Sequence, residues 1–316
     1  MLERMNSTSA SPSIVVLSTG GTIACTTDDS GALVPTRQAA DLVQGLEYPL
    51  PVRAVDYLQL DSSAITPADL DRLLAKIRGL LGDPATAGVV ITHGTDSLEE
   101  TAMALACQLA PAKPVVLTGA QRAADHPDPD GPGNLQLALD TACLHAGAAT
   151  GGAWVCFGGQ TLPAAGVRKR HTSQLDAFES LEVPHALSAR FPLPAGALDT
   201  APVATLTAYP GAGRDLVDAA LASGARGIVV AAMGSGNMSP AMGQALGEAL
   251  RAGVSVVIST RSPYGAVRLA YGGDGGGASL GAAGALGAGP LRPGQVRILL
   301  AACLAGGVDP AEVFSF

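Results

Sequence analysis

The sequence predicts an α/β protein with two domains: a larger N-terminal domain built on a doubly wound, mainly parallel sheet, and a smaller C-terminal α/β domain. Short runs of apolar, β-branched residues alternate with segments of helical periodicity almost from the start of the chain, which is typical of parallel sheets covered on both faces. A proline-rich stretch interrupts this alternation, and a second, shorter alternation follows it. The chain has 316 residues, 47% of them hydrophobic, so it is long enough to bury two substantial cores.

In the N-terminal part, four apolar runs are expected to be buried parallel strands. They lie at residues 13–18, 88–93, 114–119 and 153–157. A helix is expected between the first two, because Thr66 is a favourable N-cap and Pro67 suits the first helical position. Its apolar stripe consists of Leu70, Leu73, Leu74, Ile77 and Leu81. In a sheet of this kind, side chains at the carboxyl ends of the strands face one crevice, where ligands bind.

Residues 182–201 lack periodicity and are rich in proline, so we expect them to connect the domains. The N-terminal catalytic domain is then expected over 13–181 and the C-terminal domain over 202–316. The C-terminal domain is expected to contain strands at 203–209, 227–233 and 255–260, with helices at 215–222, after Pro240 and around 296–304. Residues 272–289 are almost entirely Gly, Ala, Ser and Leu, which suggests a mobile or loosely packed loop.

Charge and cysteine usage narrow the class of partner. A net charge of −8 disfavours nucleic acid and anionic membrane surfaces as partners. No run approaches the roughly 18 uncharged apolar residues of a membrane-spanning helix, and the polar N-terminal segment lacks the apolar stretch of a secretory signal. The five cysteines are scattered, without CxxC pairs or metal-ligand spacing, as is usual for reduced thiols in a cytoplasm. We therefore expect a cytoplasmic protein that acts on a small molecule.

Hydroxyl and charged side chains gather at four places in the chain, three of them just after an expected strand. Each place also has a purely structural explanation: a tight turn, an N-cap with an acidic first helical turn, a loop turn or a solvated cation. Because strand ends in this architecture face one crevice, their convergence on a shared site is the better explanation. The side chains are Thr22, Asp61 and Ser62, Thr95 and Asp96, and Lys169.

These residue types suit acyl transfer from an amide, with no metal and no cofactor. A threonine hydroxyl is a weak nucleophile until a base removes its proton. We expect a partly desolvated Lys169 to accept that proton through Thr95, while Asp96 orients the lysine. Backbone N–H groups at the glycine turn and at the helix start can stabilise the oxyanion of a tetrahedral intermediate.

Two segments, STGGTIA (18–24) and GVVITHGTDSLEETA (88–102), resemble the signatures of the bacterial-type L-asparaginase family, which includes the glutaminase-asparaginases. The resemblance covers essentially the whole chain: residues 115–138 are similar to the family's third-strand segment, and AMGSGN (232–237) to its C-terminal-domain turn. It implies hydrolysis of L-asparagine to L-aspartate and ammonia through a covalent acyl-enzyme, and it leaves a minor glutaminase activity and the preference between asparagine and glutamine open.

The resemblance also implies roles for single residues. It places the nucleophile on Thr22 and the family's second threonine, aspartate and lysine on Thr95, Asp96 and Lys169. Thr22 would attack the side-chain amide, and the polar segment after it would be a lid.

Substrate binding is implied in the same way. The serine that binds the substrate α-carboxylate falls on Ser62, with Asp61 beside it, and Asp96 would also hold the substrate α-amino group through charge-assisted hydrogen bonds. Asn237 would reach the active site of a neighbouring subunit, because the family builds its sites across an intimate homodimer, often paired into homotetramers.

The lid departs from the family pattern. The family usually carries a tyrosine there, which is thought to help activate the first threonine, but no tyrosine occurs between Ile14 and Glu47. An aliphatic residue among 32–34 stands near the expected place, and the alternative is that Tyr264 or Tyr271 supplies the hydroxyl.

A second departure concerns a C-terminal glutamate that, in some members, crosses from the partner subunit toward the substrate amino group. Between Arg268 and Val308 the only acidic residue is Asp274, in the glycine-rich segment. We therefore expect weaker binding of the substrate and a raised KM.

Two other functions stay open. The missing lid tyrosine favours a catalytically weak or inactive protein that binds or senses an amino acid. The family's amidotransferase branch, which releases ammonia for use on an aminoacyl-tRNA, carries an extra N-terminal domain; only a short segment precedes the first expected strand here, and the acidity of the chain disfavours tRNA contact. A dinucleotide site is weaker still, because TGGTIA does not match GxGxxG.

Overall fold

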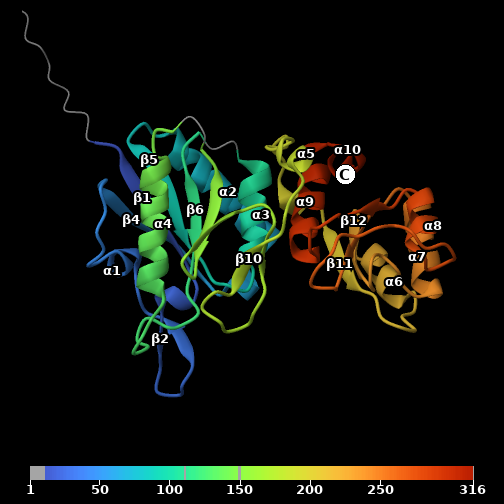
Figure 1. Cartoon of the computed structure of the whole chain (residues 1–316), viewed down its shortest axis with the longest axis horizontal. Helices are drawn as coiled ribbons and strands as arrows, with labels where there is room; N and C mark the ends of the chain where they lie inside the picture. The colour runs from blue at the N-terminus through green and yellow to red at the C-terminus, as the bar shows by residue number, and fades with distance from the viewer. Residues whose placement is uncertain (1–10, 110–111, 149–150, 316) are drawn as a thin grey trace, which may run out of the picture.

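The structure is a computed structural model that describes residues 11–109, 112–148 and 151–315, and it consists of two α/β domains side by side (Figure 1). The predicted fold class is confirmed: the larger sheet belongs to the N-terminal part and the smaller one to the C-terminal part. Most of the polar N-terminal segment, and Phe316 at the end of the expected C-terminal domain, lie outside the described residues.

The N-terminal sheet has six strands in the order β4-β1-β5-β6-β7-β8. Neighbouring strands are parallel except for the pair of β7 with β8. The strands are β1 (Ser13–Gly20), β4 (Val52–Leu60), β5 (Thr86–Thr92), β6 (Val115–Thr118), β7 (Ala153–Phe157) and β8 (Gln160–Pro163); the helices are α1 (Ala39–Leu42), α2 (Pro67–Gly82), α3 (Leu98–Gln108) and α4 (Gly131–His145).

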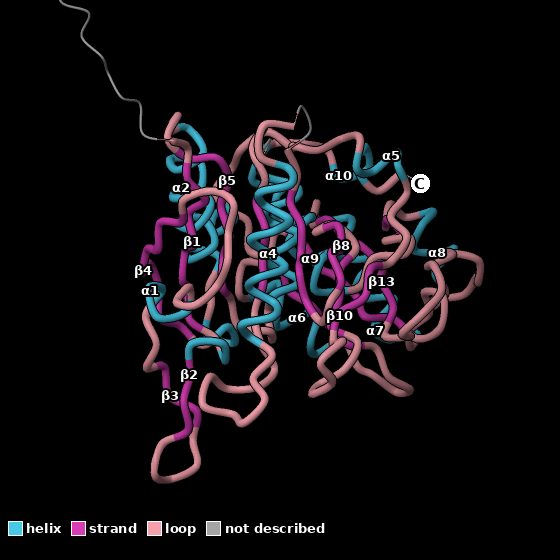
Figure 2. Tube along the Cα trace, turned by 60° about the vertical axis from the view of Figure 1, so that its left-hand side comes forward, coloured by secondary structure: helices cyan, strands magenta, loops and turns pink. Residues whose placement is uncertain are grey.

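Helices cover both faces of this sheet, which explains why its central strands are apolar on both sides. Val15 and Leu17 of β1 pack into the core formed with α2 and α3, whereas Ile14 and Val16 pack toward α4. All four side chains are fully buried. Helix α4 lies across one face of the sheet (Figure 2). Strand β4 was not predicted, because it lies at the sheet edge and places polar residues among its apolar ones.

The start of α2 follows the sequence expectation closely. Thr66 is the N-cap, and its side-chain hydroxyl accepts a hydrogen bond from the backbone N–H of Asp69 at 3.2 Å. Asp69 in turn accepts from the backbone N–H of Thr66 at 2.9 Å, which completes a capping box. This cap places the preceding residues, Asp61 and Ser62, at the carboxyl end of β4.

The C-terminal sheet has four parallel strands in the order β11-β12-β13-β14. Helix α9 contacts three of them and also packs against α3 of the N-terminal domain, so it belongs to the interface between the domains (Figure 1). The strands are β11 (Val203–Thr207), β12 (Gly227–Ala232), β13 (Ser255–Thr260) and β14 (Leu286–Gly287); the helices are α6 (Asp215–Ala222), α7 (Pro240–Arg251), α8 (Gly277–Ala282), α9 (Pro293–Gly306) and α10 (Pro310–Val313).

The expectation of a mobile or loosely packed loop over residues 272–289 is wrong. The segment contains α8 and β14, and the side chains of Leu280, Ala285 and Ala288 are buried. Its small residues allow close backbone packing, because a Cβ atom added to Gly275 would lie 2.2 Å from the backbone oxygen of Met238. The glycine content of this segment therefore reflects tight packing.

Residues between the two sheets include the short helix α5 (His185–Ser188) and a 3-10 turn at Leu198–Thr200. Leu187, Leu193 and Leu198 are buried against the larger core. We propose residues 182–201 as the connection between the domains, in line with their place between the sheets. Among the described residues, no helix is both long and apolar enough to cross a lipid bilayer.

Truncation of Leu280 tests whether residues 272–289 are packed. The Leu280 side chain is 3% exposed, so Leu280→Ala should lower the free energy of unfolding by roughly 3 kcal/mol through lost burial and a cavity. Leu144→Ala is the matched control, because Leu144 is 78% exposed and its truncation should change stability by less than about 0.5 kcal/mol. Urea unfolding measures the free energy of unfolding of both variants. An equal loss of stability in Leu280→Ala and Leu144→Ala would contradict a packed segment.

Candidate active site

The carboxyl ends of β1, β4 and β5 meet at a cavity of about 200 Å³. Five of the side chains predicted to act on a substrate line it: Thr22, Asp61, Ser62, Thr95 and Asp96. The other lining residues are Gly21, Cys25, Leu33, Pro35, Leu60 and Gly94. Another cavity, of about 270 Å³ between α1 and α4, contains none of the predicted site residues.

Glycines bring the turns after β1 and β5 into backbone contact. Gly20 and Gly21 have φ angles of 102° and 84°, a left-handed conformation that glycine adopts without strain. A Cβ atom on Gly21 would lie 2.4 Å from the backbone nitrogen of Gly94, and one on Gly94 would lie 2.5 Å from Ser62 Oγ. Only glycine fits at 21 and 94, and this contact sets Thr22 beside Thr95 around one cavity.

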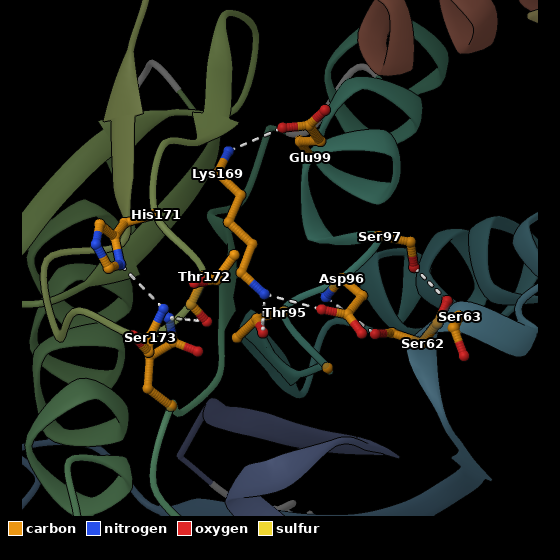
Figure 3. A network of polar contacts seen from close by, with 12 residues as sticks. Ser62, Ser63, Thr95, Asp96, Ser97, Glu99, Lys169, His171, Thr172 and Ser173 are labelled. Atoms are coloured by element: carbon orange, nitrogen blue, oxygen red, sulfur yellow. Dashed lines mark hydrogen bonds and ion pairs between the residues drawn. The ribbon is translucent and has the colours of Figure 1, made fainter.

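Lys169 joins Thr95 and Asp96 in a compact polar cluster (Figure 3). The Lys169 ammonium nitrogen lies 2.8 Å from Thr95 Oγ1 and 2.8 Å from Asp96 Oδ1. The Lys169 side chain is 19% exposed and that of Asp96 is 63% exposed, so the lysine is the more desolvated partner. The cluster can orient a proton donor or acceptor toward the cavity.

The local environment of Lys169 differs from the polar stretch expected from the sequence. Lys169 is the last residue of β9 (Val167–Lys169), which pairs antiparallel with β10 (Phe178–Ser180). A strand holds the lysine more firmly than a loop would, because its backbone N–H and C=O groups have fixed directions.

Ser62 is buried beneath the start of α3. Its hydroxyl oxygen accepts a hydrogen bond from the backbone N–H of Asp96 at 3.1 Å, and its backbone oxygen accepts from the Ser97 hydroxyl at 2.6 Å (Figure 3). The Ser62 hydroxyl hydrogen is therefore free to donate to a bound carboxylate. Asp61 caps the same turn by accepting from the backbone N–H of Ser63 at 3.0 Å.

His93, part of the second signature, was given no role in the sequence analysis. The ring is fully buried, with Nδ1 2.7 Å from the backbone oxygen of Gly94 and Nε2 3.0 Å from Thr101 Oγ1. Burial lowers the pKa of His93 to about 4, so the ring is neutral at pH 7. Because a carbonyl oxygen only accepts, Nδ1 carries the hydrogen and Nε2 accepts from Thr101. His93 thus holds the turn that contains Thr95.

The segment after Thr22 forms a β-hairpin of β2 (Cys25–Thr27) and β3 (Leu33–Pro35). The loop after β6 holds it: Ala124 N–H donates to the Cys25 backbone oxygen at 2.8 Å, and Asp125 accepts from Thr27 N–H at 2.8 Å. Leu33, one of the aliphatic residues expected near the lid position, lines the cavity.

Tyr264 and Tyr271 do not line the cavity within this chain. The Tyr264 hydroxyl lies 3.3 Å from Glu179 Oε2, and its ring lies 4.5 Å from the Arg168 guanidinium, whereas the Tyr271 side chain is largely exposed. A tyrosine in the lid position would therefore have to come from another copy of the chain.

Cys25 lines the cavity next to Thr22, but its thiol is a poor nucleophile. Burial raises the pKa of Cys25, and the nearby Asp61 carboxylate raises it further. Because the thiolate is the reactive form, both effects lower the reactivity of the Cys25 thiol.

Asn237 and Asp274 lie in the C-terminal domain, away from the residues that line the cavity. Asn237 Oδ1 accepts from the Gly277 backbone N–H at 3.4 Å, and Asp274 accepts from the Gln244 side chain at 2.8 Å. The structure of one chain does not bring Asn237 to the site, so any contribution of Asn237 would come from a second copy.

The two-domain α/β fold thus places a polar cavity, lined by hydroxyl and carboxylate side chains, at the strand ends of the larger sheet. The family model "Asparaginase, N-terminal" matches residues 13–190, and "Glutaminase/Asparaginase C-terminal domain" matches residues 202–315. The chain therefore belongs to the asparaginase family.

Individual relatives agree with this membership. The chain is 35% identical to a probable L-asparaginase of Deinococcus radiodurans, with 96% of each chain covered, and 32% identical to L-asparaginase 2 of Bacillus subtilis, with 84% of this chain and 78% of that protein covered. It is 33% identical to a component of the glutamyl-tRNA(Gln) amidotransferase of Methanopyrus kandleri, with 82% of this chain but 63% of that protein covered. The crystal structure of a probable cytoplasmic L-asparaginase from Campylobacter jejuni superimposes with a TM-score of 0.79 at 29% identity, with 96% and 98% of the two chains covered.

The buried neutral His93 predicts a pH-dependent stability. Its pKa is about 4 when folded and 6.5 when unfolded, so between these values only the unfolded chain gains the proton, and acidification destabilises the fold. This effect should reach on the order of 3 kcal/mol by pH 4. Urea unfolding from pH 7 to pH 4 measures it.

His93→Gln should remove this component of the pH slope, whereas His185→Gln, at an exposed position, should leave it unchanged. Glu99, whose pKa is raised to about 7, acts on stability in the opposite direction over the same pH range. Because Glu99 is present in both chains, the difference between His93→Gln and the unsubstituted chain isolates the contribution of His93. Identical pH slopes for His93→Gln and the unsubstituted chain would refute a buried neutral histidine.

Proposed function

We propose that the protein is an L-asparaginase that hydrolyses the side-chain amide of L-asparagine to L-aspartate and ammonia, with Thr22 as the nucleophile. One observation carries the proposal: Thr22, Thr95, Asp96 and Ser62 line the same cavity, and Lys169 bonds to two of them. Their residue types match what amide acyl transfer requires.

The proposed reaction proceeds in two halves. The Thr22 hydroxyl oxygen attacks the side-chain carbonyl carbon, and its proton passes by way of Thr95 to the Lys169 side-chain nitrogen. The tetrahedral intermediate collapses when the C–N bond breaks, the proton goes to the leaving nitrogen, and ammonia departs. Water then attacks the ester on Thr22, and L-aspartate leaves as the threonine hydroxyl is restored.

Backbone N–H groups at the two contacting glycine turns would stabilise the negative charge that develops on the carbonyl oxygen. Such preorganised donors contribute about 3 kcal/mol each to transition-state stabilisation in other acyl-transfer enzymes. The rigid contact of Gly21 with Gly94 supports this role, because donors that need not reorganise are the effective ones.

Substrate binding would use the two ends of the amino acid. The free hydroxyl hydrogen of Ser62 would donate to the α-carboxylate, with Asp61 beside it, and the exposed Asp96 carboxylate would accept from the α-ammonium. The cavity of about 200 Å³ suits a substrate of amino-acid size. Glutamine differs by one methylene, worth roughly 1–3 kcal/mol, so a minor glutaminase activity belongs to the proposal.

The proposed assembly is a homodimer, or a homotetramer of two such dimers, in the cytoplasm. Asn237, which does not line the cavity of its own chain, would reach the neighbouring subunit's cavity. The similar protein of Campylobacter jejuni is described as cytoplasmic, which supports the location.

Each alternative function has one observation in its favour. Leu33, which lines the cavity from the lid, brings no hydroxyl to the site, as suits an amino-acid binding or sensing protein. The similarity to a component of an amidotransferase favours ammonia release for a tRNA-bound substrate. Ammonia release from free L-asparagine by this chain alone separates the proposed enzyme from both alternatives.

Removal of either threonine hydroxyl should nearly abolish turnover. Thr22→Ala and Thr95→Ala are expected to lower kcat for L-asparagine by roughly a thousandfold or more, as loss of a nucleophile or its relay does. Thr26→Ala is the matched control, because Thr26 lies on the same hairpin but its hydroxyl pairs with that of Thr36, outside the cavity. Ammonia release measures all three; undiminished turnover by Thr22→Ala would exclude it as the nucleophile.

Ser62→Ala should raise KM for L-asparagine with little change in kcat. Loss of a hydrogen bond to a charged carboxylate corresponds to roughly a 10- to 100-fold weaker interaction. Ser63→Ala is the control, since Ser63 is exposed and does not line the cavity.

The unsubstituted chain should itself have a higher KM than family members that carry the C-terminal glutamate. Asp274 bonds to Gln244, so the substrate amino group is left to Asp96. A KM in the low micromolar range would count against this reasoning.

A further inference from the structure

Glu99, in the first turn of α3, holds the backbone of Lys169. Its Oε2 atom accepts a hydrogen bond from the Lys169 N–H at 2.8 Å (Figure 3). The lysine is thus bound at both ends by one short segment, with its backbone on Glu99 and its ammonium group on Thr95 and Asp96. In the sequence, Glu99 looks only like an acidic residue that suits the helix dipole.

The strand that carries Lys169 needs an outside contact of this kind. Strand β9 has three residues, and among the described residues it pairs with β10 alone, in a sheet of two strands. A two-stranded sheet is at best marginally stable by itself, so the position of β9 depends on tertiary contacts. The long lysine side chain adds conformational freedom of its own, so its ammonium group keeps its place only while the backbone is fixed.

The first turn of α9 completes the surroundings of Glu99. Gln295 donates from its side chain to the Glu99 backbone oxygen at 3.1 Å and accepts from Gly166 N–H at 2.7 Å, just before β9. A Cβ atom on Gly294 would lie 2.6 Å from Glu99 Oε1 and 2.8 Å from Glu100 Oε1. Glycine at 294 therefore leaves the space that the two carboxylates occupy.

The charges around Glu99 make it sensitive to pH. Burial raises the pKa of Glu99 to about 7, and the neighbouring Glu100 carboxylate adds to this; the Lys169 N–H bond, Arg168 and Lys169 oppose it. Burial also raises the pKa of Glu100, against Arg297 of α9, and Glu100 Oε2 has no hydrogen-bond partner among the described residues.

We propose that Glu99 is a positioning residue for the amide hydrolysis, because it fixes the Lys169 backbone where the lysine amine reaches Thr95 and Asp96. Its effect on turnover rests on the proposed function, whereas the contact itself does not. The carboxylate form holds the N–H more strongly than the neutral acid, since charge-assisted hydrogen bonds are about twice as strong. Glu99 therefore supports the reaction best above its pKa.

Three variants test the proposal. Glu99→Ala should lower kcat roughly 10- to 100-fold with KM changed less than about threefold, because the lost hydrogen bond is charge-assisted. Glu99→Gln keeps an acceptor oxygen and should recover most of kcat, but without the rise in kcat through pH 7. Glu100→Gln is the matched control: it has the same burial, no contact with Lys169, and should move that rise to lower pH, because a like charge beside Glu99 is removed.

Amide hydrogen exchange of Lys169, followed by NMR, is the readout that needs no turnover. Exchange at this amide should be at least about tenfold faster in Glu99→Ala than in the unsubstituted chain, as expected for loss of a bond of this strength. It should be unchanged in Glu100→Gln.

The outcomes separate the two proposals. Unchanged Lys169 exchange in folded Glu99→Ala, or unchanged kcat there while Thr22→Ala is inactive, would overturn the positioning role. Faster exchange supports that role even if the unsubstituted chain releases no ammonia, and the absence of ammonia would then overturn the hydrolase function alone. A rise in kcat through pH 7 that persists in Glu99→Gln would refute Glu99 as the group that titrates.

Discussion

The candidate site depends on one constraint: the backbones of Gly21 and Gly94 touch, and neither residue can carry a side chain there. The contact joins the turns after two adjacent parallel strands, so the hydroxyl groups of Thr22 and Thr95 face one cavity from different parts of the sequence. Ser62 lies directly beneath Gly94, which brings the turn after β4 to the same place. Three strand ends thus converge without any large side chain between them.

Helix α3 connects this contact to the rest of the site. The helix begins just after Asp96, and its first turn carries Glu99, which holds β9 and so brings Lys169 back to Thr95. On its other side, α3 packs against α9, whose Gln295 bonds both to Glu99 and to the residues before β9. The C-terminal domain therefore supports the lysine of the N-terminal site through one helix, which gives a physical reason for the two domains to fold against each other.

The sequence predicted what local patterns encode. Strands β1, β5, β6 and β7 are apolar on both faces and were found; β4 was missed because an edge strand mixes polar with apolar residues. The glycine-rich composition of residues 272–289 gave a wrong prediction, because composition cannot distinguish a backbone that packs closely against another from one that is free.

The site residues also differ in how far local sequence patterns predict them. Thr22, Thr95 and Ser62 lie at strand ends, where the fold class alone predicts that polar residues meet. Glu99 and His93 act through partners that the local pattern does not reveal. The bond from Lys169 to Glu99 spans 70 residues, and the pKa of His93 is lowered to about 4 because the fold buries the ring.

Within one chain, the Thr22 hydroxyl makes no hydrogen bond to any of the described residues, although it lines the cavity. Leu33 supplies apolar surface to the cavity but no hydroxyl that could polarise the threonine. As the proposed nucleophile, Thr22 would need a proton acceptor from elsewhere in the cavity, and the Thr95–Lys169 pair is the acceptor that the proposal assigns. The lysine is useful only while β9 holds it at that distance. Precise placement of Lys169 therefore matters more here than in a site whose lid carries a tyrosine, since no second hydroxyl compensates for its displacement.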